Sequence, residues 1–317
     1  MLLGIEIGGT KLQLGVGTGE GPPLVELVRL EVRPERGAEG IRQQIAEHGR
    51  PLVARYAVQA VGIGFGGPVD SARGRTIVSH QVGGWEDFPL AEWCRQALGV
   101  PVLLANDSDS AGVAEACFGA GKGHRVVFYT NVGSGIGGAL VIEGRLYSGS
   151  AGVASEIGHL RPGLECRSAE QTVESQASGW AISAAAAQAM RQAPDSPSAQ
   201  DLLRRCGGQP EPLSTRIVAE AAAEGNPLAQ AALDRACRTY GWAVAQVVTL
   251  LAPSVVVLGG GVSLVGEQWW LAPVRRYVDQ YVFPPLRGTF QIEPARLGEE
   301  VVIHGALALA RQMRADK

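Results

Sequence analysis

Residues 126–159 read VVFYTNVGSGIGGALVIEGRLYSGSAGVASEIGH, and this stretch decides which fold the chain can adopt. A largely apolar segment at 126–131 is followed by the glycine-rich GSGIGG at 133–138 and by a second apolar segment at 139–142. Short apolar segments bounded by glycine are typical of buried strands. The stretch therefore predicts a strand, a tight glycine turn and a returning strand.

The N-terminal residues repeat this arrangement. Residues 2–7 (LLGIEI) lead into the turn GGTK at 8–11, after which apolar residues alternate along 12–16 as in a second strand. Each of the two turns also carries a hydroxyl residue, Thr10 in the first and Ser134 in the second. This similarity suggests an internal duplication, with one hairpin in each half of the chain.

Other predicted strands end in residues that suit a binding site. Three apolar segments are followed by glycines or by an acid: residues 58–65 by Gly66 and Gly67, residues 100–104 by Asn106 and Asp107, and residues 254–258 by Gly259, Gly260 and Gly261. Glycine contributes 43 of the 317 residues, roughly twice its average share of about 7%. Because α/β folds bind ligands at the carboxyl ends of their strands, we expect these positions to surround a ligand.

The composition excludes several classes of protein. A length of 317 residues predicts about two domains, and 46% hydrophobic residues can fill both cores. The net charge of −3 leaves no basic surface for nucleic acid or an anionic membrane. The five cysteines stand singly, and the N-terminal residues do not resemble a signal peptide. We therefore expect a soluble cytoplasmic protein without a disulfide framework.

The two glycine turns suit phosphate binding. Consecutive glycines let backbone N–H groups approach an anion, and Thr10 and Lys11 add a hydroxyl donor and a cation. Taken alone, the turn at 8–11 is equally well explained as an ordinary hairpin turn. Two such turns in a duplicated setting favour a nucleotide whose phosphates both turns hold, the second through Gly133, Ser134 and Gly135.

Several carboxylates have both a structural and a functional interpretation. Asn106 and Asp107 stand at a strand-to-helix junction, where either residue type is favoured as a helix N-cap. The same place, at the end of a strand, suits a carboxylate that acts on a ligand. Glu156 and His159 share one short turn, and Glu174 follows. These three residues could equally be solvated loop side chains.

Together these motifs resemble the ROK family of sugar kinases, with glucokinase-like members the most similar. The resemblance covers essentially the whole chain. Besides residues 126–159, the motifs that carry it fall in the family's order: GIEIGGTK at 4–11, GIGFGGPVD at 62–70, GWEDFPL at 84–90, NDSDSAG at 106–112 and VVLGGGV at 256–262.

The resemblance implies an actin-like (ribonuclease H-like) ATPase fold of two α/β domains with a cleft between them. The small N-terminal domain would span 1–107 and be completed by a C-terminal helix at about 298–317, with the large domain at 108–297. The implied activity is ATP-dependent phosphorylation of a hexose, glucose at the 6-hydroxyl first among them. The implied partners are a small-molecule sugar, ATP and Mg²⁺, in a protein that forms a homodimer.

The resemblance also implies roles for individual residues. Asp107 would be the general base that accepts the proton of the sugar hydroxyl. The sugar-binding positions correspond to Gly66, Gly67, Asn106, Asp107, Glu156, His159 and Glu174. The ATP-binding positions correspond to Gly8, Gly9, Thr10, Lys11, Gly133, Ser134, Gly135, Gly259, Gly260 and Gly261. Glu6 would help to hold Mg²⁺ through water.

Three departures from the family pattern bear on these roles. Glu6 stands where the family has aspartate, which keeps the charge but adds a methylene. His80 and Gln81 replace the Pro-Asn that relatives commonly carry, which bears on the choice of sugar. The three cysteine positions of the family's zinc site hold Glu165, Arg167 and Thr172, with Cys166 out of register by one. We therefore expect no zinc.

Two alternatives to a glucokinase remain at this stage. One is a kinase for fructose or for an N-acetylated hexosamine. The other is a catalytically weak sugar-binding sensor or regulator on the same fold, which the Glu6 departure and the lost cysteines would suit. Intact Asp107 and both glycine turns favour the kinase. No winged-helix segment precedes Gly4, which disfavours the repressor branch of the family.

Overall fold

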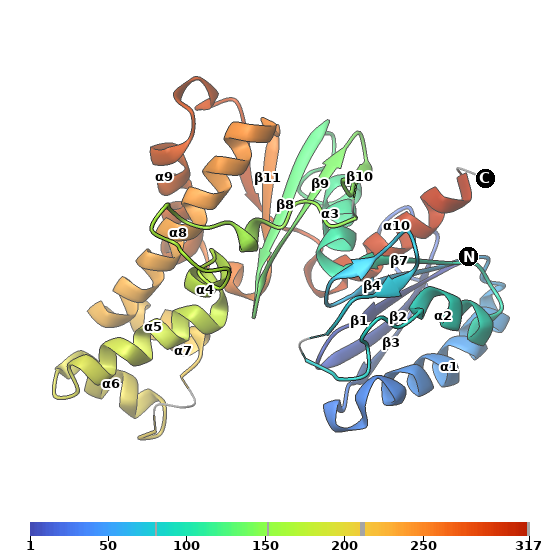
Figure 1. Ribbon diagram of the computed structural model, residues 1–317, viewed down its shortest axis with the longest axis horizontal. Helices are drawn as coiled ribbons and strands as arrows, with labels where there is room; N and C mark the ends of the chain where they lie inside the picture. Colours follow the sequence, from blue (N-terminus) through green and yellow to red (C-terminus); the bar gives the residue numbers. More distant parts are fainter. Residues whose placement is uncertain (80, 151, 210–212, 316–317) are drawn as a thin grey trace. The chain divides into compact units, whose positions relative to one another are not determined.

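A computed structural model describes residues 1–79, 81–150, 152–209 and 213–315 (Figure 1). The chain divides into two compact units, each built from more than one segment. Unit 1 comprises Met1–Tyr129, Ala139–Ser155 and Ala295–Lys317, and unit 2 comprises Thr130–Gly138 and Glu156–Pro294. His80, which the sequence analysis singled out, lies outside the described residues.

Unit 1 contains a five-stranded sheet in the order β3-β2-β1-β4-β7. Its strands are β1 (Leu2–Ile7), β2 (Lys11–Gly17), β3 (Glu26–Glu31), β4 (Val61–Phe65) and β7 (Val102–Asn106). The three strands β1, β4 and β7 run parallel, and β2 and β3 continue the sheet antiparallel. Every residue of β1 and β4 is buried, as expected of strands that are covered on both faces.

Helices pack on this sheet. The helix α1 (Gly37–Tyr56) contacts β1 and β2, and α2 (Leu90–Leu98) contacts α1 and β7. The last helix, α10 (Val301–Ala315), packs on β1 and β4, and α3 (Asp107–Phe118) lies along α10. Gly305 makes this close approach feasible, because a Cβ atom at that position would overlap the carbonyl oxygen of Ser110 in α3. Segments from opposite ends of the chain thus form one core.

A second five-stranded sheet has the order β10-β9-β8-β11-β12. Its strands are β8 (Val126–Val132), β9 (Ile136–Ile142), β10 (Arg145–Tyr147), β11 (Val255–Gly259) and β12 (Gln291–Pro294). The division between the units passes through β8 and β9, so that the tip of their hairpin belongs to unit 2. Both predicted strand–turn–strand hairpins are therefore confirmed, as β1–β2 and β8–β9.

Unit 2 is rich in helices. They are α4 (Glu174–Ala177), α5 (Gly179–Gln192), α6 (Pro197–Arg205), α7 (Thr215–Ala223), α8 (Pro227–Leu251) and α9 (Ala272–Tyr281). The long helix α8 packs against α5, α7 and α9, and its buried Tyr240 donates a hydrogen bond to Thr130. The α8 N-terminus is capped by Asn226, whose side chain accepts hydrogen bonds from two backbone N–H groups.

Short elements complete the structure. They are β5 (Val69–Asp70), β6 (Arg75–Thr76) and the turns η1 (Pro34–Arg36), η2 (Ile157–His159), η3 (Gly261–Val265), η4 (Glu267–Leu271), η5 (Pro284–Leu286) and η6 (Gly298–Glu300). No helix in the described part of the chain is long and apolar enough to cross a membrane.

The compact units divide the chain differently from the expected domains. Residues 108–129 group with the N-terminal residues in unit 1, whereas the expected boundary lies after residue 107. The packing of α3 against α10 accounts for this grouping, because α10 in turn packs on β1 and β4.

Candidate active site

The β1–β2 turn lies next to the end of β4 in unit 1. The N–H of Gly8 donates to the carbonyl of Lys11 at 3.0 Å, and the N–H of Gly66 donates to the carbonyl of Ile7 at 2.8 Å. Gly8 and Gly66 are half-buried, whereas Thr10 is exposed at the tip of the turn. The predicted phosphate turn and the predicted sugar-side glycines are therefore neighbours, although they are more than fifty residues apart in the sequence.

Glu6 lies in β1, directly before this turn, and is only 7% exposed. Its Oε1 is 3.1 Å from the Nζ of Lys11, and its Oε2 is buried without a hydrogen-bond partner among the described residues. Burial raises the pKa of the Glu6 carboxyl, and the Lys11 ammonium opposes that rise. A buried carboxylate oxygen without a donor suits a bound cation or its water, so this position fits the predicted magnesium role.

Asn106 is the N-cap of α3, which confirms the structural interpretation of the strand-to-helix junction. Its side-chain oxygen accepts hydrogen bonds from the N–H groups of Ser108 at 2.8 Å and Asp109 at 3.4 Å. Its Nδ2 donates to the carbonyl of Gly67 at 2.9 Å. The Asn106 side chain therefore joins α3 to the glycines that follow β4.

The same cap fixes Asp107 as the first residue of α3. Its Oδ1 accepts a hydrogen bond from the N–H of Ser108 at 2.7 Å. A Cβ atom built on Gly66 would lie 3.5 Å from Oδ2 of Asp107 and 3.6 Å from the Cα of Gly8. Burial raises the pKa of the Asp107 carboxyl, and the hydrogen bonds from Ser108 oppose that rise. The predicted base thus lies beside the first glycine turn.

In unit 2, the predicted nucleotide residues gather at the tip of the β8–β9 hairpin. The N–H of Gly133 donates to the carbonyl of Gly135 at 2.8 Å, which closes the turn. The carbonyl of Gly133 accepts from the N–H of Gly179 at 2.8 Å. Gly260, with φ of 83°, packs closely on the backbone of Val132. Gly260 therefore lies next to the strand that leads into the second glycine turn.

Two segments that carry the predicted sugar-binding residues of unit 2 contact the same hairpin. Oε2 of Glu174 accepts a hydrogen bond from the N–H of Ile136 at 2.7 Å. Gly158 packs so closely on the carbonyl oxygen of Ile136 that a Cβ atom there would overlap it. Glu156 and His159 lie on either side of Gly158 and are exposed. Glu174 and the turn that carries Glu156 and His159 thus both contact Ile136, the residue that follows the second glycine turn.

The predicted residues therefore fall into one group per unit. Unit 1 carries Glu6, Gly8, Gly9, Thr10, Lys11, Gly66, Gly67, Asn106 and Asp107, and unit 2 carries Gly133, Ser134, Gly135, Glu156, His159, Glu174, Gly259, Gly260 and Gly261. No role was expected for Gly158 or Gly179 from the sequence. The signals were present, because Gly158 stands inside EIGH and Gly179 follows Ser178, the N-cap of α5.

A model of the ROK family matches residues 2–313. The chain belongs to the ROK family. It is 33% identical over 320 residues to a glucokinase of Streptomyces coelicolor, covering 98% of each chain. It is 29% identical over 268 residues to an N-acetylmannosamine kinase of Yersinia pestis, covering 83% of each. The crystal structure of a Streptomyces griseus ROK glucokinase with glucose and AMPPNP is similar with a TM-score of 0.81, 33% identity and coverage of 98% and 99%.

This ROK family protein has the actin-like fold that the resemblance implied. Backbone and side-chain hydrogen bonds hold its 160–173 loop. The N–H of Val173 donates to the carbonyl of Leu160 at 2.8 Å, and Oε1 of Gln171 accepts from the N–H of Arg167 at 2.6 Å. Within the ranges that the structure describes, no three His, Cys, Asp or Glu residues are placed to hold a metal. The absence of zinc stays a prediction.

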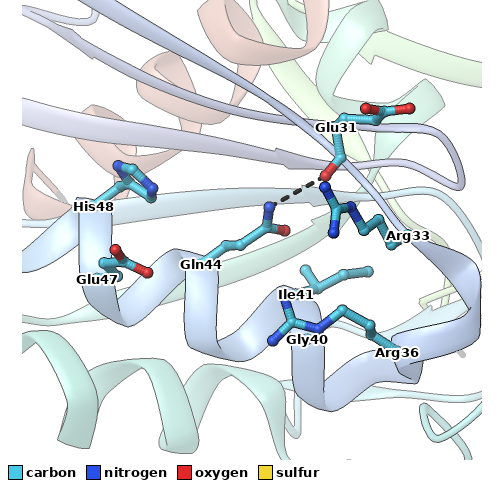
Figure 2. Close-up of a pocket in the computed structure, with 8 residues that line it drawn as sticks. All are labelled: Glu31, Arg33, Arg36, Gly40, Ile41, Gln44, Glu47 and His48. Carbon is cyan, nitrogen blue, oxygen red and sulfur yellow. Dashed lines mark hydrogen bonds between the residues drawn. The ribbon is translucent and has the colours of Figure 1, made fainter.

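Unit 1 also contains a pocket of about 320 Å³ (Figure 2). It is formed by α1 and the segment after β3, where the Nε2 of Gln44 donates to the carbonyl of Glu31 at 3.1 Å. Arg33, Arg36 and Glu47 also line it, so its charges are of both signs. None of the predicted site residues lines this pocket.

Proposed function

We propose that this ROK family protein transfers the γ-phosphoryl group of ATP to the 6-hydroxyl of a hexose, with glucose as the first candidate. The observation that carries the proposal is the position of Asp107, beside Gly66 and Gly8 and at the start of α3. A carboxylate next to a phosphate-binding turn is where phosphoryl transfer to an alcohol needs a base. The likeness to the glucokinases of Streptomyces coelicolor and Streptomyces griseus supports it.

Asp107 would act on the sugar hydroxyl. Its carboxylate accepts a hydrogen bond from the attacking hydroxyl, orients that oxygen toward the γ-phosphorus and receives the proton as the new bond forms. Burial raises the pKa of Asp107, which makes its carboxylate a better proton acceptor than that of an ordinary aspartate. The Ser108 N–H bond to Oδ1 fixes the plane of the carboxylate.

The glycine turns and Lys11 would hold the phosphates. The backbone N–H groups of Gly9, Thr10, Ser134 and Gly135 would donate to phosphate oxygens, and Lys11 adds a positive charge. Bound Mg²⁺ neutralises phosphate charge in such reactions. The Oε2 atom of Glu6, which has no donor within the described residues, is the oxygen available to that ion or to its water.

Glu156, His159 and Glu174 would bind the sugar. Ionised carboxylates accept hydrogen bonds from vicinal hydroxyls with defined geometry, which suits a hexose. Gln81, whose side chain lies against Gly9, stands where relatives commonly have asparagine, so it bears on which sugar is preferred. We further propose a cytoplasmic homodimer, and light scattering of the purified protein tests the oligomeric state.

A coupled assay of ADP release tests the activity. We would compare glucose, fructose, N-acetylglucosamine and N-acetylmannosamine with the wild type, Asp107→Asn and the exposed control Asp195→Asn. We expect glucose to stimulate turnover most, and Asp107→Asn to lower kcat by about 10²–10⁴-fold, the usual contribution of a general base. The control should match the wild type.

Two other outcomes would select the alternatives. If N-acetylmannosamine or fructose stimulates turnover more than glucose, the protein is a kinase for that sugar; the Yersinia pestis relative favours the first of these. If no sugar stimulates turnover while calorimetry shows sugar binding, the protein is a sugar-binding sensor and the kinase proposal is wrong.

A further inference from the structure

We propose that Glu174 is a positioning residue that links the sugar site to the second phosphate turn, so that sugar and nucleotide bind cooperatively. The inference rests on the proposed function and assigns a second task to a residue of that site. One oxygen of the Glu174 carboxylate holds the β8–β9 turn, and the other is left for a sugar hydroxyl.

The first observation is the hydrogen bond between Glu174 and the hairpin. The N–H of Ile136 donates to Oε2 of Glu174 at 2.7 Å, across 38 residues of sequence. Hydrogen bonds to a charged acceptor are shorter and roughly twice as strong as those between neutral groups. Ile136 is buried and follows Gly135 directly, so this bond fixes one end of the phosphate turn.

The second observation is the space around Gly135. A Cβ atom at this position would lie 2.7 Å from Oε2 of Glu174. Gly135 does not have the positive φ that would by itself require glycine. The absent side chain therefore provides room for the Glu174 carboxylate. The close approach of the Glu174 carboxylate therefore accounts for glycine at position 135, which the conformation of the turn alone does not require.

The third observation is that the other end of the turn is held by the same segment. The carbonyl of Gly133 accepts from the N–H of Gly179 at 2.8 Å, and the N–H of Ser178 donates to the carbonyl of Glu174 at 3.1 Å. Residues 174–179 thus contact the turn at two points. A shift of Glu174 would move both of these contacts.

The free oxygen of Glu174 completes the link. Glu174 is half-exposed, and its Oε1 accepts no hydrogen bond from the residues that the structure describes. A sugar hydroxyl that donates to Oε1 would immobilise the carboxylate. The immobilised carboxylate would favour the one position of the turn in which the N–H groups of Ser134 and Gly135 meet the phosphates. By reciprocity, nucleotide binding would strengthen sugar binding by the same factor.

Calorimetry with AMPPNP and Mg²⁺, with and without saturating glucose, tests this link. In the wild type we expect glucose to lower the Kd of AMPPNP by about 5-fold or more, the lower end of typical coupling. In Glu174→Ala, the glucose-free Kd should rise several-fold and the effect of glucose should disappear. Glu174→Gln keeps an oxygen that can accept from Ile136, so its glucose-free Kd should stay near that of the wild type. Glu165→Ala is the exposed control from the same loop.

A second variant, Gly135→Ala, disturbs the contact between Gly135 and the Glu174 carboxylate by adding a methyl group to the glycine. The added methyl would displace the carboxylate, so we expect the glucose-free Kd of AMPPNP to rise as in Glu174→Ala. In the Glu174→Ala background the same methyl has no carboxylate to displace, and its effect should largely vanish. A general loss of stability would instead give additive effects, which melting curves of the four proteins would also show.

Three outcomes would overturn the inference: no coupling in the wild type, an unchanged Kd and coupling in Glu174→Ala, or additive effects of the two substitutions. Failure of the proposed function has a different signature. If the wild type binds both glucose and AMPPNP with coupling but releases no ADP, only the proposed activity fails. If it binds neither ligand, both proposals are wrong.

Discussion

At the scale of the residue, the location of Asp107 in the fold changes the pKa of its carboxyl. The carboxylate begins α3, where the Ser108 N–H favours its charge, yet burial is the larger effect and raises its pKa. A group whose pKa is higher in the folded than in the unfolded state binds its proton more tightly when folded. The ionised form therefore lowers stability once the pH exceeds the ordinary pKa of an aspartate, about 3.9.

The raised pKa of Asp107 predicts the pH dependence of activity. Because the base must be ionised, kcat/KM should fall on the acid side through a pKa above the ordinary aspartate value. The measurement is the rate of ADP release between pH 4.5 and 8 at limiting sugar, with circular dichroism at each pH to confirm folding. An acid limb that remains flat down to pH 4.5 would contradict the prediction.

At the scale of the element, the pairing of α3 with α10 holds the end of α3 that carries Asp107. α10 packs on β1 and β4, and α3 lies along α10 with Asp107 at its start. Gly305 permits the approach of the two helix backbones at Ser110. The position of Asp107, the proposed base, therefore depends on a glycine nearly two hundred residues away.

The substitution Gly305→Ala tests this dependence. Its methyl group would overlap the backbone carbonyl of Ser110. Neither a Cβ atom nor a backbone carbonyl can turn away independently of its helix, so one of the two helices must move. We expect a loss of about 1–3 kcal/mol in the free energy of unfolding, the usual cost of overpacking, together with reduced kcat. Urea denaturation measures the first effect. Gly83→Ala is the matched control, since a Cβ atom there meets nothing within 4 Å; equal midpoints for the two variants would refute the prediction.

At the scale of the whole molecule, each unit is assembled from separated segments. Unit 1 takes its last segment from residue 295 onward, and this segment covers a sheet made by residues 2–106. Ile303 and Leu307 of α10 are buried against Leu2 and Ala60. Glu115 of α3 fixes the start of the segment, because its buried carboxylate accepts from the N–H groups of Arg296 and Leu297, both at 2.8 Å.

This assembly predicts the effect of truncation. A chain that ends at residue 294 would expose the apolar face of β1 and β4, and we expect it to be insoluble or rapidly degraded. The substitution Leu307→Ala weakens the same packing less severely, and we expect it to lower the free energy of unfolding by about 2–5 kcal/mol, as is usual for a buried leucine. Limited proteolysis followed by mass spectrometry measures both effects. Full protection of residues 1–129 in the truncated chain would show that unit 1 folds without α10.

The two hairpins and the family could be recognised from the amino-acid sequence alone. These features are local. A strand, a glycine turn and a motif such as EIGH each consist of consecutive residues, and those residues determine the local geometry of the chain. The sequence allowed both a structural and a functional interpretation of Asn106, and the structure shows that its side chain caps α3. Only the tertiary structure decided why Gly135 is glycine, what Glu174 holds and which segment covers the first sheet. Those answers are contacts between residues far apart in the chain, which no spacing within one motif can specify.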